Sequence, residues 1–233
     1  MKTPLWVPRS SSGNTTFIMK LSTASNVVLT LLSTGLVACT QMNETPTYGD
    51  FLAAHSKDYP ATMEVYMDEA QMAKATPKSP IHICLEQQRG RLYVDGQVAA
   101  DWPVSTGKEG TETPVGTFRI KEKKKKHFSS LWGTIVDEND ICVVESADSR
   151  KDRVPAGGEF LGAKMENWQK LTNDGVGIHT GQVRVGKQLS KGCVRTPGFV
   201  ADALFNITEV GSKVTISRKP EAAWPGNAAE TEK

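Results

Sequence analysis

The sequence has little excess charge of either sign, few aromatic residues and no glycine-rich cofactor motif. Its 233 residues include 28 Lys and Arg against 26 Asp and Glu, a formal net charge of +2. A general nucleic-acid binder usually has a strongly basic face, so we expect no nucleic-acid partner. The lack of a Gly-rich phosphate or dinucleotide loop implies no cofactor. With 38% hydrophobic and 7% aromatic residues, the composition is typical of a globular body and not of a protein with several membrane spans.

Long hydrophobic runs are also missing. The apolar stretch 27–32, with its continuation to Cys39, is too short and too rich in Ser and Thr for a convincing transmembrane helix. Lys20 precedes it and a small residue precedes Cys39, which is the pattern of a secretory signal. Residues 36–39, Leu-Val-Ala-Cys, resemble the bacterial lipobox, whose cysteine is lipidated and becomes the new N-terminus. We predict a signal peptide with lipobox over 1–39; an ordinary cleaved signal with a chance cysteine is the alternative.

A lipid on Cys39 predicts an exported protein that is anchored to a membrane and faces the periplasm or cell wall. Met19 is a better start for this signal than Met1, so residues 1–18 are either an over-long start or an unusually long n-region. Thr40 is not the Asp that accompanies inner-membrane retention in some Gram-negative bacteria, which leaves the choice of membrane open.

Cysteine is scarce: besides Cys39, the chain has three others, and an odd number of thiols in an oxidising compartment raises the question of which one stays free. Cys84 and Cys142 each lie in a β-branched, strand-like run, so we predict a small buried apolar residue at both positions. A disulfide between these two is the alternative, and only a structure can decide it. Cys193 follows a glycine among polar residues, which is a different setting.

After the signal, the sequence pattern changes twice. Residues 40–79 are polar at first and then have apolar residues at spacings of three and four, which predicts a spacer with two helices separated by Pro60, or helices that pack on the outside of the next domain. From 80 to 217, short alternating segments and turn signals such as Asp95-Gly96 predict a mainly β domain, a sandwich or barrel with minor helices. Residues 218–233 are small and polar, which predicts a disordered tail.

Four segments need a separate interpretation. Residues 165–171 and 197–206 are predicted as helices within the β domain, and 63–70 as the core of the second spacer helix. The run 121–126, Lys-Glu-Lys-Lys-Lys-Lys, follows a strand, and we interpret it as a solvated β-edge or loop. A patch for an anionic polymer or for lipid headgroups is the alternative.

The candidate site combines His179 and Cys193. A free cysteine has a pKa near 8.5, and a neighbouring imidazole can take its proton to give a thiolate–imidazolium pair that attacks a carbonyl. Gly192 permits unusual backbone angles, so the N–H groups of Gly192 and Cys193 can point at a developing oxyanion. Arg195 can hold a substrate carboxylate through a bidentate contact, and Ser190 can form a hydrogen bond beside the nucleophile. Taken alone, a His and a Cys in one chain fit a structural pair better than a catalytic one.

Several motifs in order resemble one known family. Segments 178–181 (Ile-His-Thr-Gly) and 190–195 (Ser-Lys-Gly-Cys-Val-Arg) resemble the signature of the L,D-transpeptidase catalytic domain, the YkuD type, in which a His, a loop and Ser-His-Gly-Cys-Ile/Val-Arg form the site. Residues 102–108, 113–118 and 211–216 are similar to its Val-Ser-Thr-Gly strand, its Thr-Pro-x-Gly-x-Phe motif and its closing Gly-x-x-Val strand. The resemblance covers the predicted β domain and implies a β-sandwich-like catalytic domain with a few short helices.

By this resemblance, Cys193 attacks the carbonyl of the third residue of a peptidoglycan stem tetrapeptide, expels the terminal D-alanine and passes the acyl group to an amine. His179 serves as general base and then as acid, and the backbone carbonyl of Thr180 orients its ring. Lys191 stands where the family often has His, which leaves the acceptor preference open. Its cation can lower the Cys193 pKa or bind a substrate carboxylate, or it can face solvent.

Other functions compete with this one. Water in place of the amine makes the same acyl-enzyme an L,D-carboxypeptidase or a hydrolase, and cleft shape decides between them. A wall-binding lipoprotein without catalysis is a further alternative, against which the intact pair of His179 and Cys193 speaks. A metal site on these two residues has too few clustered ligands for zinc, so we predict no metal.

Overall fold

The computed structural model describes residues 45–220. The predicted signal peptide, the lipobox cysteine and most of the predicted tail lie outside the described residues. The first compact unit of the chain ends at Thr45 and the second begins at Pro46, so the description below concerns the second. In chain order its elements are α1 (Tyr48–Ala54), β1 (Tyr66–Met67), α2 (Glu69–Met72), β2 (Ile81–Cys84), β3 (Arg89–Val94), β4 (Gln97–Pro103), β5 (Gly116–Arg119), β6 (Glu122–Val136), β7 (Cys142–Asp148), β8 (Glu159–Lys170), β9 (Gly177–Thr180), β10 (Val194–Thr196), α3 (Gly198–Ile207) and β11 (Lys213–Ser217).

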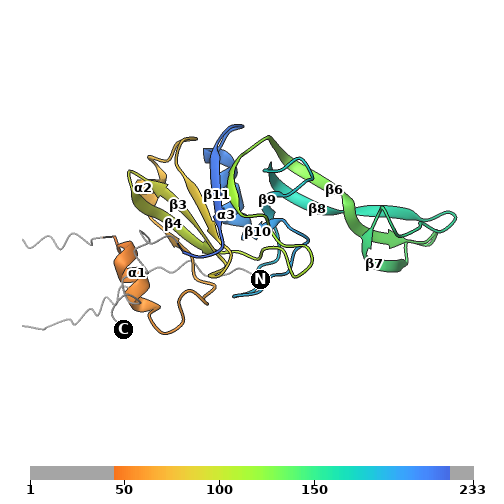
Figure 1. Ribbon diagram of the computed structural model, residues 1–233, viewed down its shortest axis with the longest axis horizontal. Coiled ribbons are helices and arrows are strands. Elements are labelled where there is room, and N and C mark those ends of the chain that lie inside the picture. The colour runs from red at the N-terminus through yellow and green to blue at the C-terminus, as the bar shows by residue number, and fades with distance from the viewer. Residues whose placement is uncertain (1–44, 221–233) are drawn as a thin grey trace, which may run out of the picture. The chain divides into compact units, whose positions relative to one another are not determined.

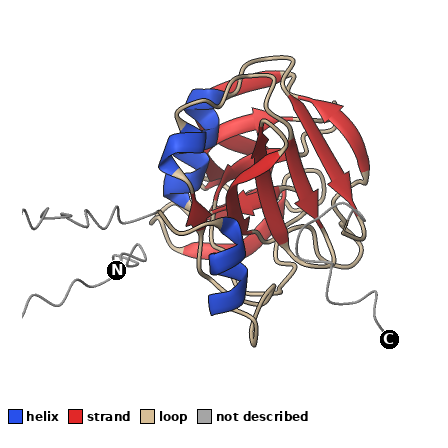
Figure 2. Cartoon of the chain, turned by 90° about the vertical axis from the view of Figure 1, so that its left-hand side faces the viewer, coloured by secondary structure: helices blue, strands red, loops and turns tan. Residues whose placement is uncertain are grey.

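Two sheets account for most of these elements, as Figure 2 shows in red. The first sheet has the strand order β1-β4-β3-β2-β11-β5, and the second has the order β10-β9-β8-β6-β7 (Figure 1). One core cluster contains side chains from both sheets and from α3, among them Ile81, Trp102, Ile178 and Leu204, all at most 1% exposed. The prediction of a mainly β, sandwich-like domain with a few short helices is therefore confirmed.

The hairpin of β3 and β4 forms where the sequence predicts it. Asp95 and Gly96 connect the two strands with φ angles of 50° and 77°. Both angles lie in the left-handed region, where the Asp-Gly pair is favoured in a two-residue turn that matches the strand twist. The predicted strand at 213–217 is also present, as β11, and it pairs in parallel with β2 and antiparallel with β5.

The segment before β2 packs on the first sheet. Tyr48 and Phe51 of α1 form a small buried cluster with Tyr66 and with Val98 of β4. Tyr66 and Met67, predicted as part of a helix, instead form β1 and pair with Asp101 and Ala100 of β4. The prediction of one helix over 63–70 is therefore wrong: this segment contains the short strand β1 and the start of the four-residue helix α2.

A buried ion cluster joins the same segment to the sheet. Asp101 of β4 is fully buried, and its carboxylate accepts hydrogen bonds from Arg89 Nε at 2.6 Å and Arg91 Nε at 2.8 Å. The hydroxyls of Tyr48 and Tyr59 donate to the same carboxylate at 2.5 and 2.9 Å. The two guanidinium groups hold the pKa of Asp101 below its usual range in spite of burial. Because Tyr48 belongs to α1 and Asp101 to β4, the cluster joins α1 to β4. Removing one partner of such a buried ion pair would leave an uncompensated charge, which is strongly destabilising.

The second sheet has long strands where the sequence predicted short ones. Residues 165–171, predicted as a helix, belong almost entirely to β8, which pairs with β6 and β9. The lysine run lies at the start of β6 and pairs with β8 on one side, whereas β7 joins β6 only from Trp132 onward. The other side of the run is therefore an exposed strand edge, as predicted.

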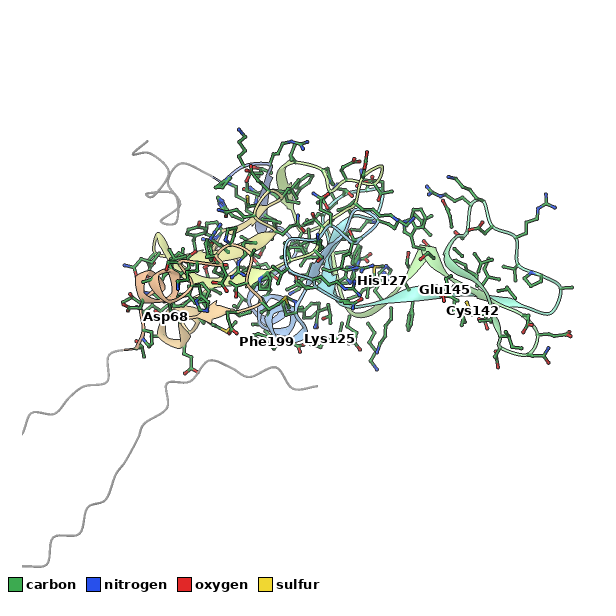
Figure 3. The ribbon with its side chains drawn as sticks, turned by 90° about the horizontal axis from the view of Figure 1, so that it is seen from below. Asp68, Lys125, His127, Cys142, Glu145 and Phe199 are labelled. Atoms are coloured by element: carbon green, nitrogen blue, oxygen red, sulfur yellow. The ribbon has the colours of Figure 1, made fainter. Side chains whose placement is uncertain are left out.

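The three described cysteines are all free thiols. Cys84 is buried in β2, as predicted, but Cys142 is exposed on β7, so the prediction of a buried residue there is wrong. Figure 3 labels Cys142 and Glu145 on β7. The alternative of a disulfide between Cys84 and Cys142 is excluded in this structure.

Candidate active site

His179 lies in β9, and Cys193 lies directly before the neighbouring parallel strand β10. In the pairing of β9 with β10, Arg195 is opposite His179 and Val194 is opposite Ile178. Continuing this register by one residue places Cys193 opposite Gly177, on the same face of the sheet as His179. Strands about 4.8 Å apart with a rise of about 3.3 Å per residue put the Cα atoms of Cys193 and His179 about 8 Å apart.

The turn before Cys193 is held by hydroxyl groups. The Ser190 hydroxyl accepts a hydrogen bond from the Gly192 N–H at 3.1 Å and donates to the Cys193 carbonyl at 2.5 Å. The Thr113 hydroxyl donates to the Gly192 carbonyl at 2.7 Å and accepts from the Gly107 N–H at 2.8 Å. Ser190 and Thr113 are both buried. These bonds fix the backbone on both sides of the cysteine.

Gly192 is required by this turn. Its φ is +110°, a backbone conformation that residues other than glycine rarely adopt, and a Cβ at this position would lie 3.3 Å from the Val176 side chain. Of the two amides expected to bind an oxyanion, that of Gly192 is already bonded to Ser190. The Cys193 amide makes no hydrogen bond within residues 45–220, so it is the one free to receive a ligand oxygen.

His179 is held in one orientation. It is 7% exposed, and its Nδ1 lies 2.8 Å from the Thr180 carbonyl, so Nδ1 donates this bond and Nε2 is left as the acceptor. Burial lowers the pKa of His179 to about 4, and the charges of Arg195 and His127 act in the same direction against the opposing hydrogen bond to Thr180. The imidazole is therefore neutral at pH 7 and able to accept a proton.

The Cys193 thiol is protonated at rest. Burial raises its pKa and the charge of Asp174 adds to this, while a hydrogen bond from the Gly177 backbone and the charge of Arg195 act against it. Its Sγ donates to the Gly175 carbonyl at 3.7 Å and not to the imidazole. The sequence suggested a thiolate–imidazolium pair, whereas in the resting site both the Cys193 thiol and the His179 imidazole are neutral.

A chain of polar contacts reaches the side chain of Thr180, the residue whose backbone carbonyl orients His179. The Asn167 side-chain amide donates to the Thr180 hydroxyl at 3.2 Å and to Asp202 at 3.0 Å. Asp202 in turn accepts from Lys125 at 2.5 Å. Asn167 is buried in β8 with a φ of +55°, a left-handed conformation that asparagine tolerates better than most residues. The sequence analysis did not single out Asn167, and no motif marks it.

Aromatic rings fill the space behind His179. Trp168 of β8 lies between two histidine rings, with centroids 5.0 Å from His127 and 6.1 Å from His179. Figure 3 shows His127 and Lys125 on β6. Trp168 is 2% exposed, so it excludes water from this side of the imidazole and contributes to the low pKa of His179 through burial.

Two cations flank the nucleophile in the sequence. The aliphatic part of Arg195 lies against Gly181, where a Cβ would come within 2.8 Å of its Cγ. The Arg195 guanidinium makes no hydrogen bond or ion pair with the described residues, which leaves it available to a substrate carboxylate. The Lys191 ammonium lies over the ring of Trp132 in β6, 4.5 Å from its centroid, so its position is set by that ring.

Two features are absent from residues 45–220. No group of three or more His, Cys, Asp or Glu side chains is placed to hold a metal ion. None of the helices in this part of the chain has the length and apolar character needed to cross a bilayer.

A model of the L,D-transpeptidase catalytic domain family, YkuD, matches residues 80–216, more than half of the chain. The chain belongs to the L,D-transpeptidase family. The matched range includes both sheets except β1, and it contains His179, Cys193 and the motifs that suggested the family from the sequence.

Solved L,D-transpeptidase structures resemble this chain. The enzyme from Stackebrandtia nassauensis is 19% identical, with a TM-score of 0.44 over 65% of this chain and 63% of its own. The enzyme from Mycobacterium smegmatis is 20% identical, with a TM-score of 0.46 over 60% of this chain and 58% of its own. The catalytic domain of the Enterococcus faecium L,D-transpeptidase is 27% identical, with a TM-score of 0.42 over 61% of this chain and 98% of its own. This chain thus spans about three fifths of the length of the first two. No curated protein sequence matches it.

Proposed function

We propose that this protein is a peptidoglycan L,D-transpeptidase in which Cys193 is the nucleophile and His179 the general base and acid. The L,D-transpeptidase family acts on peptidoglycan stem peptides. The observation that supports the proposal is the register of β9 and β10: Arg195 pairs with His179, and continuing the register by one residue puts Cys193 opposite Gly177, on the face of His179. The fixed imidazole and the free Cys193 amide supply the other groups that acyl transfer needs.

The first half-reaction forms a thioester. The Cys193 thiol turns from the Gly175 carbonyl towards Nε2 of His179 and loses its proton to this nitrogen as the sulfur attacks the carbonyl carbon of the third stem residue. The Cys193 amide binds the oxyanion. The carbon–nitrogen bond to D-alanine then breaks, and the imidazolium gives its proton to the leaving amine. Because both groups are neutral at rest, the proton moves during the attack and not before it.

The second half-reaction transfers the acyl group. An amine, in the proposal the side chain of a diamino acid on a neighbouring stem, attacks the thioester and loses a proton to His179. The Cys193 sulfur leaves as the thiolate and takes this proton from the His179 imidazolium, which restores the resting site. With water as the attacking group, the same steps release a tripeptide, and the protein is then an L,D-carboxypeptidase or hydrolase.

Product analysis by mass spectrometry tests the proposal. The purified protein is incubated with stem tetrapeptides, and a Cys193→Ala variant is the control. Cross-linked dimers, formed by the wild type and absent with the variant, are the expected result. Tripeptides alone would rule out transfer as the main activity, and equal turnover by the variant would refute the assignment of the nucleophile.

We further propose that Cys39 carries a lipid, so that the catalytic domain is exported and tethered to a membrane, facing the periplasm or cell wall. The support for this is the Leu-Val-Ala-Cys segment directly after an apolar run. An extracytoplasmic position also fits a peptidoglycan substrate.

A further inference from the structure

Lys191 and Arg195 lie two residues before and two residues after Cys193, and neither is neutralised. The ion pairs of the described residues involve other cations, and neither of these two side chains makes a hydrogen bond there. Unpaired cations beside a nucleophile are candidates for anion recognition. As described above, Arg195 is available to a substrate carboxylate, whereas the charge of Lys191 has no role in the proposed mechanism.

The ring of Trp132 fixes where that charge lies. The Lys191 ammonium is 4.5 Å from the ring centroid, and both side chains are half-buried. A cation over a tryptophan face is attracted by the ring quadrupole, so this ammonium has fewer accessible positions than an ordinary surface lysine. Its N–H groups remain available, because the ring takes none of them as an ordinary hydrogen-bond acceptor. A preorganised donor loses less conformational entropy when a ligand binds.

A second cation at the same ring has been neutralised, which singles out Lys191. The Arg150 guanidinium lies 5.2 Å from the Trp132 centroid, but Asp148 accepts two bonds from it at 2.8 Å each. The pKa of Asp148 is lowered to about 2 by this contact, so the pair stays ionised at neutral pH. The uncompensated charge at the ring is therefore that of Lys191.

We propose that Lys191, held by Trp132, forms a second carboxylate-binding subsite, so that the protein selects stem peptides with a free carboxylate besides the one bound by Arg195. This inference rests on the proposed function and names the substrate class of the same site. The Lys191 ammonium is held over Trp132 of β6, so the subsite lies at this ring, where it suits a carboxylate other than the one at Arg195.

The test compares two synthetic stem tetrapeptides that differ in one feature. In one peptide all carboxylates are free; in the other the side carboxylates are amidated and the terminal carboxylate is kept. The measured quantity is the ratio of KM for the amidated peptide to KM for the free one. A single solvated ion pair predicts a ratio of about five for the wild type at low salt, falling towards one at high salt.

Variants assign this ratio to the subsite. Lys191→Met removes the charge and keeps most of the side-chain length, so the ratio is expected to fall to about one, whereas Lys191→Arg keeps it above two. Trp132→Leu is expected to lower the ratio as well, because the ammonium is no longer held. Lys187→Met is the matched control: Lys187 is an exposed lysine of the same connection, and its loss should leave the ratio unchanged.

The subsite and the proposed function can fail separately. If the wild type turns over the free peptide but has the same KM for both peptides, or if Lys191→Met keeps the wild-type ratio, the subsite is refuted and the enzyme assignment stands. If no turnover occurs, binding of the two peptides to Cys193→Ala is measured by calorimetry. A preference for the free peptide that Lys191→Met abolishes in that background supports the subsite, and equal affinities refute it.

Discussion

The neutral resting state of the catalytic pair makes a quantitative prediction about pH. The proposed mechanism needs His179 unprotonated, and its pKa is lowered to about 4, mainly by burial. At pH 5.5 an imidazole with a pKa of about 4 is about 97% unprotonated, and with a pKa one unit higher it is about 76% unprotonated. An ordinary histidine of pKa about 6.5 would be only about 9% unprotonated. We therefore expect kcat/KM at pH 5.5 to keep at least three quarters of its value at pH 7.

The assay is the pH dependence of acylation by a stem tetrapeptide, with the fold monitored by circular dichroism. This control is needed because the unfolded chain binds a proton at His179 below pH 6.5 that the folded chain does not bind. The free energy of unfolding consequently falls as the pH falls, by about 1.4 kcal/mol at pH 5.5 from this residue. Arg195→Met should move the acid limb to higher pH, because the charge of Arg195 contributes to the low pKa of His179.

Thiol alkylation gives an independent check. Because the pKa of Cys193 is raised by burial, alkylation of Cys193 by iodoacetamide should be slow at pH 7 and should accelerate steadily towards alkaline pH. Rapid alkylation with a plateau between pH 5 and 7 would indicate a thiolate–imidazolium pair. That plateau, or an acid limb of kcat/KM near pH 6.5, would refute the reasoning from burial.

Four other substitutions test separate features of the protein. Thr113→Val removes the hydroxyl that donates to the Gly192 carbonyl, so we expect kcat to fall about tenfold, as for one lost hydrogen bond to a buried group, with recovery in Thr113→Ser. Asn167→Ala should lower kcat and leave KM nearly unchanged, because the Asn167 side chain contacts Thr180, which orients the His179 imidazole, and does not contact the substrate. A KM that changes by as large a factor as kcat would contradict this. Asp101→Asn should lower the free energy of unfolding by about 3–5 kcal/mol in urea titrations, since it leaves two buried guanidinium groups uncompensated. Cys39→Ala should release the protein from the membrane fraction, and persistent membrane association would count against the lipid anchor.

Much of the fold could be predicted because local sequence signals agree with it. The Asp-Gly turn at 95–96 requires left-handed angles that these residues adopt easily, and the helix predicted at 197–206 is present as α3. The prediction failed at 165–171, where Met165, Trp168 and Leu171 recur every three residues. In the structure Asn167 has a positive φ within β8, which breaks the alternation of the strand and leaves Trp168 and its neighbours on both sides buried. A single sequence cannot separate this irregular strand from a helix.

The candidate site was predicted in its parts but not in its contacts. The sequence motifs at 178–181 and 190–195 singled out His179 and Cys193, because each motif is a short local pattern and Gly192 directly precedes the cysteine. The contact of Lys191 with Trp132 joins residues 59 positions apart, and that of Thr113 with Gly192 joins residues 79 positions apart. Nothing local in the sequence encodes such pairings. The protonation states were missed for the same reason: they depend on burial, which arises only when the two strands and Trp168 come together.

The central claim is that the sulfur of Cys193 carries the acyl group of a stem peptide. Intact-protein mass spectrometry after rapid mixing with a stem tetrapeptide, followed by peptide mapping in acid, measures this directly. The account predicts a mass increase equal to the mass of the tetrapeptide minus the mass of D-alanine, located on the peptide that contains Cys193 and absent in Cys193→Ala. Turnover of the tetrapeptide with no adduct at any mixing time, or an adduct on Cys84 or Cys142, would contradict it.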